Sequence, residues 1–403
     1  MPIWENDYFT FIPPNEKTPQ AFIAWGAKRV FQINPTNLHA FEELNEWISQ
    51  AKHPIFGYLA YEAKQLTEDV GYQNTCEDGS QLIKFYEAES VYTFQNHAWK
   101  PVTEEKPNER SEVNALWDFA LAKPTHHEKI SFTCEEAQES YLEKFNHIQE
   151  QIQRGNYYET NFCMGFTGEG KLQAPLEAFK KLNEKTEAPY AVYYSDKDTV
   201  LLCSSPELFV KRKGNKLTSS PIKGTIKRGH TPKEDSDNQQ QLLSSEKERS
   251  ENIMIVDLVR NDLSRIATKN SVQVESLCAL HTFKNLHHLI SDVSCEVEED
   301  TSFTQIMKAL FPMGSMTGAP KISAVKDMEK VEAQSRGLYS GSFGYILPNG
   351  DFEFNVIIRS AIHDKRNAKT YVKVGSAITR ASVGKQEFDE CLLKAAATLA
   401  IFE

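Results

Sequence analysis

Hydrophobic and polar positions divide the chain into two stretches with different patterns. Before about residue 125, aromatic residues and prolines are frequent, and the short apolar runs are typical of β-strands. From about residue 131, helical and strand-like patterns alternate, so we expect an N-terminal subregion at 1–125 and a second region at 126–403. The strand-like runs are 21–25, 56–61 and 91–94 in the first stretch, and 159–166, 191–194, 200–203 and 208–211 in the second.

Three long segments carry the apolar period of an α-helix. The segment 135–154 is followed by Gly155, a residue type that commonly ends helices. The segment 244–266 begins where Ser245 and Glu248 have the spacing of a capping box. The segment 385–400 has the same period throughout. Between residues 100 and 110, two prolines and the lack of any apolar period predict a surface loop.

Composition limits the class of protein. Hydrophobic residues make up 40% and charged residues 25% of the 403 positions, which is enough apolar material for a folded core. The net charge of −11 argues against binding to nucleic-acid phosphates, and no apolar run approaches the roughly 18 residues that cross a membrane. The seven cysteines are scattered, without the spacing of a disulfide framework or a zinc site. We therefore expect a cytoplasmic protein that binds neither nucleic acid nor membranes.

Charged residues stand beside several strand-like runs. Glu207 comes just after the run at 200–203. Lys223 lies between an isoleucine and Gly224, and its simplest interpretation is a solvated loop lysine. Arg359 lies near the end of a predicted strand at 353–361, where a guanidinium group suits two-point capture of a carboxylate.

A loop rich in Gly, Ser and Thr, FPMGSMTGAPK at 311–321, leads into a helical pattern. Free N–H groups at the start of such a helix bind anions. Gly318 is followed by Ala-Pro-Lys, so the loop is not a Walker A motif, and nucleotide binding is disfavoured.

Glu251 interrupts an apolar helical face. By the helical period it shares that face with Ile255, Leu258 and Asp262. A buried carboxylate is costly unless it is paired or bound to a metal. Either Arg249 or Arg260 forms a salt bridge with Glu251, or a cation binds there.

The last predicted helix also has a charged face. Glu387, Glu390 and Lys394 follow one another at helical spacing and share one side. They form either an exposed ion-pair network or, together with Glu251, an all-oxygen cage for a hard cation such as Mg²⁺.

Eight ordered motifs over about 131–403 resemble the chorismate-utilising enzyme family, which includes anthranilate, aminodeoxychorismate, isochorismate and salicylate synthases. The motifs are SSPELF, SPIKGTIKRG, ENIMIVDLVRNDLSRI, LHHLISDV, FPMGSMTGAPKISAVKDME, SRGLYSGSFGYI, NVIIRSA and EFDECLLKAA. The resemblance implies an α+β fold of two packed antiparallel sheets with outer helices, in which 126–403 is the chorismate-binding catalytic region.

Within the family, the stretch PIKGT at 221–225 resembles the aminodeoxychorismate synthase component I branch. That branch converts chorismate and ammonia to 4-amino-4-deoxychorismate, an intermediate of 4-aminobenzoate and folate biosynthesis. Anthranilate synthase component I is the alternative, although its members usually have alanine where Lys223 stands.

The resemblance also implies roles for single residues. It makes Lys223 the covalent nucleophile and Glu207 the acid/base group, with His288 near the reacting ring, and it places Mg²⁺ between Glu251 and Glu387 with Glu390 in or beside its shell. The implied substrate contacts are Gly224, Thr225, Ser315, Tyr339, Arg359, Gly375, Ser376, Ala377 and Lys394.

Three features depart from the family pattern. Glu159 stands where aminating members usually have glutamine and isochorismate-forming members have lysine. The run VGSAITRAS replaces a GAGIV-type run, and no LLES-like motif for tryptophan is present. None of the cysteines has the GxCxGxQ-like setting of a glutaminase, so we expect ammonia to come from a separate glutamine amidotransferase subunit.

Overall fold

The computed structural model describes residues 2–15, 20–33, 39–68, 70, 76–125, 129–332 and 334–403. The strands are β1 Phe9–Ile12, β2 Phe22–Ile33, β3 Ile55–Leu59, β4 Ile83–Gln95, β5 Ala98–Pro101, β6 Phe132–Cys134, β7 Glu159–Glu169, β8 Tyr190–Ser195, β9 Thr199–Ser205, β10 Leu208–Lys213, β11 Lys216–Ser220, β12 Ile222–Lys227, β13 Gln273–Thr282, β14 Leu286–Glu296, β15 Gly318–Ala319, β16 Ser342–Ile346, β17 Phe352–Asn355, β18 Ser360–Asp364 and β19 Lys369–Thr379. The α-helices are α1 Ala40–Ser49, α2 Glu109–Leu121, α3 Gln138–Gln153, α4 Pro175–Thr186, α5 Pro232–Ser244, α6 Glu246–Ser264, α7 Phe303–Leu310, α8 Lys321–Val331 and α9 Gly384–Leu399, and the short 3₁₀ helices are η1 Ile3–Glu5, η2 Tyr61–Leu66 and η3 Gly314–Met316.

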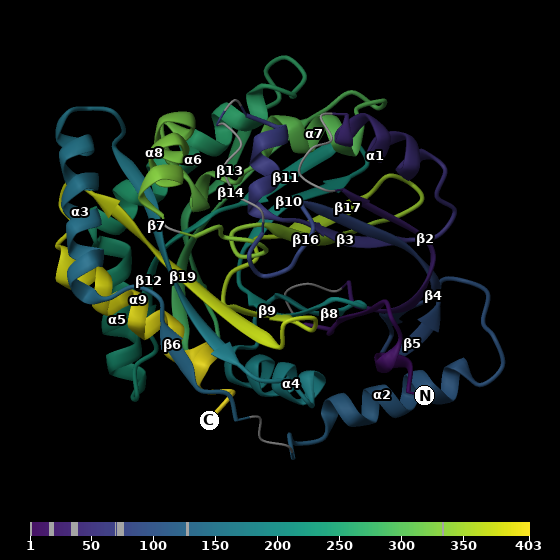
Figure 1. Cartoon of the computed structure of the whole chain (residues 1–403). Helices are drawn as coiled ribbons and strands as arrows, with labels where there is room; N and C mark the ends of the chain where they lie inside the picture. The colour runs from purple at the N-terminus through teal and green to yellow at the C-terminus, as the bar shows by residue number, and fades with distance from the viewer. Residues whose placement is uncertain are drawn as a thin grey trace.

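Antiparallel ladders join these strands into one continuous network that folds into two facing layers (Figure 1). The first layer runs through β14, β11, β10, β17, β16, β3, β4 and β2. The second runs through β8, β9, β18, β19 and β7. Strand β1 pairs with both β2 and β8, so it joins the two layers at one side. The predicted α+β class with packed antiparallel sheets is confirmed.

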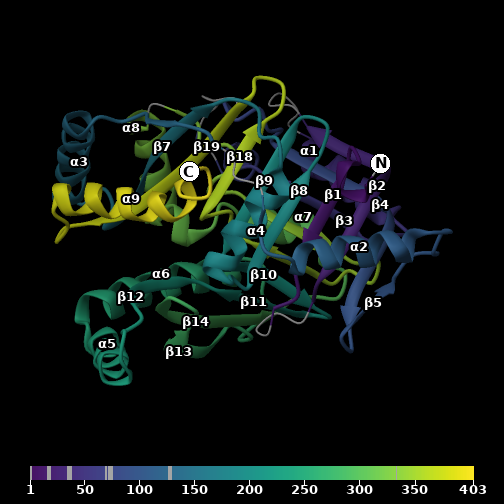
Figure 2. The ribbon, with the colours of Figure 1, turned by 90° about the horizontal axis from the view of Figure 1, so that it is seen from below.

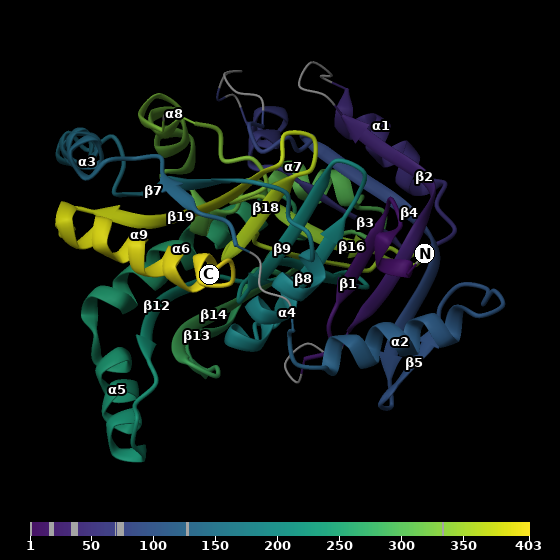
Figure 3. The ribbon, with the colours of Figure 1, turned by 60° about the horizontal axis from the view of Figure 1, so that its bottom comes forward.

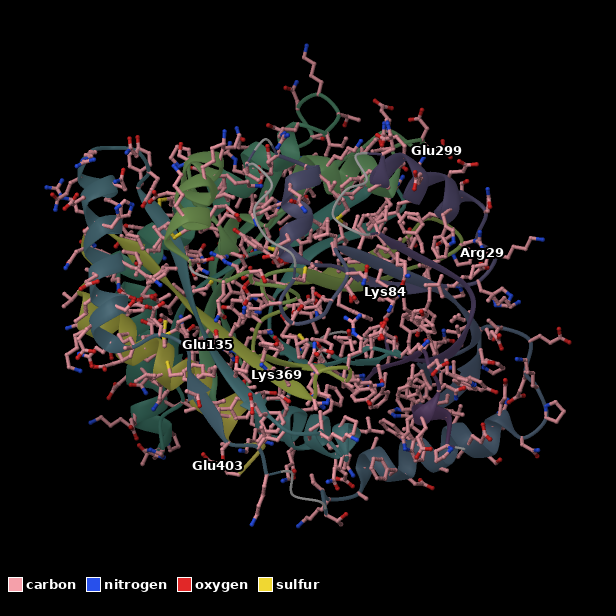
Figure 4. The ribbon with its side chains drawn as sticks, in the orientation of Figure 1. Arg29, Lys84, Glu135, Glu299, Lys369 and Glu403 are labelled. Carbon is pink, nitrogen blue, oxygen red and sulfur yellow. The ribbon has the colours of Figure 1, made fainter. Side chains whose placement is uncertain are left out.

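Aromatic side chains fill the space between the layers. Burying such large side chains is the main source of stability for a sheet sandwich. The cluster takes Phe56, Tyr58 and Tyr86 from the first layer and Val192, Tyr194 and Leu201 from the second. Lys84 of β4 also lies in this interior, where its Nζ is 2.6 Å from Oδ2 of Asp196 (Figure 4).

The two free ends of the network meet beside α6 and α9. Helix α6 packs against β12 and β14, and α9 packs against β19, the strand that pairs with β7 (Figure 2). Helix α5, which follows β12, projects away from the body of the protein (Figure 3). This arrangement brings segments distant in the sequence to one place, which holds most of the predicted site residues.

Most of the predicted elements are present with small shifts at their ends. Helix α3 ends two residues before Gly155, and Ser245 is the N-cap of α6, where its Oγ accepts a hydrogen bond from the Glu248 backbone N–H at 3.4 Å. The division at residue 125 borders 126–128, which lie outside the described residues, and it stays a prediction. Strands from both sides of it belong to one network, since β3 pairs with β16.

The single strand predicted at 353–361 is wrong. The chain leaves the first layer after β17 and joins the second at β18, so the residues between them, including Arg359, are not in a strand. Arg359 has a φ of 50°, in the left-handed region. Its apolar neighbours Val356 and Ile357 are fully buried while they cross between the layers, and this burial is why the sequence resembles a continuous strand.

Part of the glycine-rich loop is a strand, because Gly318 and Ala319 pair with β7 as β15 just before α8 begins at Lys321. The anion site expected at the start of this helix stays a prediction. At the start of α8, Lys321 places its Nζ 2.6 Å from Oδ2 of Asp262 in a buried ion pair. No helix within the described ranges is long and apolar enough to cross a membrane.

Candidate active site

Lys223 is held by a buried ion pair. It lies on β12, and its Nζ is 2.7 Å from Oε1 of Glu159 at the start of β7. The side chains of Lys223 and Glu159 are 12% and 1% exposed. Burial by itself lowers the pKa of Lys223, but the carboxylates of Glu159, Glu251 and Glu207 outweigh it and raise the pKa above its ordinary value. The solvated loop lysine is therefore excluded.

Glu207 lies in the turn between β9 and β10, where its backbone N–H donates to Ser205 Oγ at 3.2 Å. Burial raises the pKa of Glu207 to about 7, against the opposing effects of Ser315, Lys223 and Arg359. A carboxyl group with this pKa can give up and regain a proton near neutral pH.

A small cavity of about 20 Å³ lies beside Glu207 and Ser315. This volume is about that of one water molecule. Ser219 and Asp262 also line it.

Thr225, two residues after Lys223, forms a second polar pair with His288. His288 is buried, with its ring edge-on to Phe283 at a centroid distance of 5.3 Å. Gly224, between Lys223 and Thr225, has a φ of 91°, which favours glycine. A Cβ there would lie 3.2 Å from Cβ of Glu248, so the backbone of β12 lies close against α6.

Helices α6 and α9 present four carboxylates to this region. Burial raises the pKa of Glu251 to about 7. Burial also raises the pKa of Glu248 and of Glu387, and Glu390 raises both further. These carboxylates repel one another, and a cation bound between them would reduce the repulsion.

The described residues contain no group of three or more His, Cys, Asp and Glu side chains arranged to hold one metal ion. The predicted magnesium site stays a prediction. Its donors are nevertheless of the right kind, because magnesium takes one or two carboxylates and completes its shell with water and substrate oxygens. The carboxylates of α6 and α9 therefore fit such an ion chemically.

Two of the predicted salt-bridge partners are wrong. The cation nearest Glu251 is Lys247, at 3.9 Å, because it lies one turn earlier on the same helix. Arg260 instead pairs with Asp257 at 2.8 Å. On α9, Glu390 and Lys394 form a partly exposed pair at 2.7 Å.

The predicted substrate contacts on β19 lie against β7. Gly375, Ser376 and Ala377 are the strand partners of residues 161–163. Lys394 donates to the Gly375 carbonyl oxygen at 2.9 Å, which ties α9 to this strand. Ser376 Oγ lies 3.1 Å from the Tyr141 hydroxyl within the core.

Tyr339 and Arg359 occupy different surroundings. Tyr339 is 3% exposed in the hydrophobic core, where burial raises the pKa of its hydroxyl group. Burial lowers the pKa of Arg359, and the neighbouring Glu207 opposes this change. Arg359 and Glu207 thus interact electrostatically, although Arg359 lies 152 residues later in the sequence.

Sequence reasoning missed two contributors to this region. Glu248 was considered only as part of a helix cap, although it lies three residues before Glu251 and so on the same side of α6. Arg336 is buried and bonds the carbonyl oxygens of Asn161 and Met316 at 2.8 and 2.7 Å, which fixes β7 to the loop before β15. Its place as the arginine of the SRGLYSG motif was the available signal.

The chain resembles known proteins over most of its length. A family model described as chorismate binding enzyme matches residues 10–400. The chain is 39% identical over 271 residues to the chloroplastic aminodeoxychorismate synthase of Arabidopsis thaliana, covering 66% of this chain and 29% of that protein. It is 32% identical over 290 residues to aminodeoxychorismate synthase component 1 of Bacillus subtilis, covering 71% and 61%.

The matched stretches therefore span less than two thirds of either relative. Among solved structures, anthranilate synthase component I from Streptococcus pneumoniae superposes with a TM-score of 0.82 at 23% identity, over 96% of this chain and 93% of that one. That likeness shows the shared fold. From the family match over almost its whole length, the chain belongs to the chorismate binding enzymes.

Proposed function

We propose that the protein is an aminodeoxychorismate synthase component I, which converts chorismate and ammonia to 4-amino-4-deoxychorismate. The observation that carries the proposal is a buried lysine amine, Lys223, in electrostatic contact with a carboxyl group, Glu207, whose pKa is raised to about 7. A nucleophile and a proton donor are the two groups that this exchange of a ring hydroxyl for an amine requires. Both relatives named above carry the same activity in their names.

In the proposed reaction, the Lys223 amine attacks C2 of the chorismate ring while the bond between C4 and the hydroxyl oxygen breaks. Glu207 supplies a proton to this oxygen, which leaves as water. Ammonia then adds at C4, and the Lys223 nitrogen leaves C2. The enolpyruvyl group is retained throughout, so no pyruvate forms.

The two carboxylates of chorismate need positive partners. Arg359 lies near Glu207, and Lys394 of α9 bonds the Gly375 carbonyl oxygen of β19, so these two cations are the candidate partners of the carboxylates. Ser315, Thr225 and the backbone of Gly224 and Gly375 offer hydrogen-bonding groups around the same place. Ion pairs from two cations to the two carboxylates would fix the orientation of the ring relative to Lys223.

Glu251, Glu387 and Glu390 would hold the magnesium ion. When bound, the ion supplies positive charge to the ring carboxylate and to the charge that builds as the hydroxyl group leaves. The mutual repulsion of these carboxylates with Glu248 supports this assignment. We further propose that the ammonia comes from glutamine through a separate glutamine amidotransferase subunit.

The test is product identification by mass spectrometry after incubation of the purified chain with chorismate, Mg²⁺ and an ammonium salt at alkaline pH. The expected product contains nitrogen and retains the enolpyruvyl group, and Lys223→Ala lowers its formation by about a hundredfold or more. Lys216→Ala is the control, because Lys216 is a half-exposed lysine on the neighbouring strand β11 that pairs with Glu275 at 2.7 Å.

Anthranilate synthase component I is the second candidate, because the chain is 37% identical over 230 residues to anthranilate synthase component 1 of Aquifex aeolicus, covering 57% of this chain and 46% of that protein. Its reaction eliminates the enolpyruvyl group as pyruvate, so pyruvate release separates the two. Anthranilate and pyruvate from the wild-type chain, undiminished in Lys223→Ala, would move the assignment to this candidate.

A further inference from the structure

Glu159 has an unusual combination of contacts. Its Oε1 atom receives the Lys223 ammonium group at 2.7 Å, and its side chain is only 1% exposed. Its other oxygen, Oε2, is buried without a hydrogen-bond partner among the described residues. A buried carboxylate with one unsatisfied oxygen is poorly stabilised as an anion.

The backbone holds Glu159 in a fixed place. On one side Glu159 pairs with Ala319 of β15, and on the other with Thr379 of β19. A Cβ on Gly318 would lie 2.3 Å from the Glu159 carbonyl oxygen, so only glycine permits this approach. The carboxylate is thus a preorganised partner of Lys223 and not a mobile side chain that meets it by chance.

An ammonium group cannot attack the substrate, so Lys223 must first lose a proton. The carboxylates that face it are Glu159 from β7, Glu207 from the turn before β10, Glu248 and Glu251 from α6, and Glu390 from α9. Glu159 is the one within hydrogen-bond distance of Nζ in the described part of the chain. Glu207 is needed in its protonated form for the leaving hydroxyl group, and the other three fit a cation.

We propose that Glu159 accepts the proton that Lys223 must lose before its amine attacks the substrate. This inference rests on the proposed function and names a further residue of the same reaction. An N–H bond of Lys223 breaks and an O–H bond forms on Glu159, so a buried ion pair becomes a neutral amine and a neutral carboxylic acid. When the Lys223 nitrogen later leaves C2, the proton returns to it and Glu159 is again a carboxylate.

This transfer explains why a carboxylate is used here. A glutamine amide also forms a hydrogen bond with an amine, but it does not take up a proton. Burial penalises both charges of the pair, and the transfer removes both of them at once. In the resting pair the neighbouring carboxylates outweigh burial and raise the pKa of Lys223, so the lysine stays charged until the transfer takes place.

The test measures the covalent adduct between Lys223 and chorismate in the absence of ammonia. Intact-protein mass spectrometry follows adduct formation over a range from neutral to alkaline pH in wild type, Glu159→Gln and Glu159→Asp. In wild type we expect a rate that changes little with pH, because the proton acceptor is internal. In Glu159→Gln we expect a rate at least about tenfold lower at neutral pH that rises with pH as solvent removes the proton.

Glu159→Asp keeps a carboxylate in a shorter side chain, so the adduct should form more slowly than in wild type but with the same weak pH dependence. Glu177→Gln is the control, because Glu177 is another buried glutamate with a lysine partner: Lys180 Nζ lies 3.5 Å from Glu177 Oε1 and 3.5 Å from its Oε2. It lies on α4, away from Lys223, and should behave as wild type.

Equal adduct formation in Glu159→Gln and wild type at neutral pH would overturn the role of Glu159 and leave the proposed function intact. If Glu159→Gln does not fold, a strongly pH-dependent rate in Glu159→Asp would overturn the proposal, and a weakly dependent one would support it. If wild type forms neither an adduct nor an amination product, the proposed function itself fails.

Discussion

Thr225 and His288 face each other across the ladder between β12 and β14, and Thr225 Oγ1 lies 2.8 Å from His288 Nδ1. The same relationship recurs one strand away. Thr282 on β13 faces His287 on β14, and Thr282 Oγ1 lies 2.9 Å from His287 Nδ1. His287 Nε2 also lies 2.9 Å from Oδ1 of Asp235 on α5. The two adjacent histidines therefore contact different parts of the protein.

Thr225→Val should lower kcat by about tenfold, because the hydroxyl that fixes the His288 ring is lost while the shape of the side chain is kept. Thr282→Val is the control. Each change should cost about 1 kcal/mol of unfolding free energy, since each removes one hydrogen bond, but only Thr225→Val should affect turnover. Steady-state kinetics and denaturant unfolding measure the two effects. Equal losses of kcat in both variants would show that His288 has no role beyond structure.

Gly224→Ala should weaken both the fold and the activity. The residue needs a φ of 91°, and the added Cβ would lie 3.2 Å from both Glu248 Cβ and Leu289 Cδ1. We expect a loss of about 1 to 3 kcal/mol of unfolding free energy, with a fall in kcat because the adjacent Lys223 shifts. Gly350→Ala provides the comparison, since Gly350 has a φ of 85° and no atom within 4 Å of a Cβ. It should lose stability alone, by about 1 kcal/mol. Unchanged activity in Gly224→Ala would argue against close positioning of Lys223.

The pair of Lys223 and Glu159 should appear in a double-mutant cycle of stability. Lys223→Met leaves the Glu159 carboxylate buried and unpaired, which should cost about 3 to 5 kcal/mol. Adding Glu159→Gln removes that charge, so the double variant should be more stable than Lys223→Met alone. Thermal and urea unfolding measure the cycle, with a coupling energy of about 1 to 3 kcal/mol expected. Additive effects would mean that the two side chains do not interact in solution.

Stability should depend on pH through Glu207. Burial raises the pKa of Glu207 from its ordinary value of 4.5 to about 7 in the folded protein. Between these values the folded state binds more protons than the unfolded state, so the free energy of unfolding falls as pH rises through this window. The contribution of Glu207 to this fall is about 3 kcal/mol.

Glu207→Gln does not titrate, so its stability relative to wild type should increase across this window and then level off above about pH 7. Urea unfolding at a series of pH values measures the difference between the two proteins. A constant difference from acidic to neutral pH would show that the Glu207 carboxyl group ionises as readily in the folded protein as in the unfolded chain.

The sequence singled out several charged residues of this region, but it did not predict the contacts between them. Glu207, Lys223 and Glu251 follow from motifs at strand ends and on a helical face, and the structure brings them into electrostatic contact. The bond between Lys223 and Glu159 spans 64 residues and depends on the pairing of β15 with β7. A local pattern does not show such a pairing, since it arises from the way the two layers close on each other.

The position of Arg359 illustrates a second limit. Its neighbours Val356 and Ile357 are fully buried. A buried strand and a buried segment that crosses between layers both give an apolar run, so the sequence pattern does not distinguish them. The two cases differ in their backbone hydrogen bonds. Here the Val356 N–H donates to the Glu207 carbonyl oxygen and the Ile357 N–H to that of Gly341. These long-range hydrogen bonds determine the conformation of the segment before Arg359, and they cannot be predicted from apolar periodicity.

Magnesium should stabilise the metal-free protein in the absence of chorismate. The carboxylates of Glu248, Glu387 and Glu390 repel one another across α6 and α9, and a bound cation relieves this repulsion. We expect an increase of about 1.4 kcal/mol in unfolding free energy when the ion is about tenfold above its Kd. Glu387→Gln should abolish most of the increase, because it removes the most buried of these carboxylates from α9. Asp389→Asn on the same helix is the control, since Asp389 is exposed and pairs with Lys385 at 2.7 Å. Calorimetry with and without millimolar Mg²⁺, after treatment with a chelator, measures the change, and an equal response in Glu387→Gln and wild type would place the ion elsewhere.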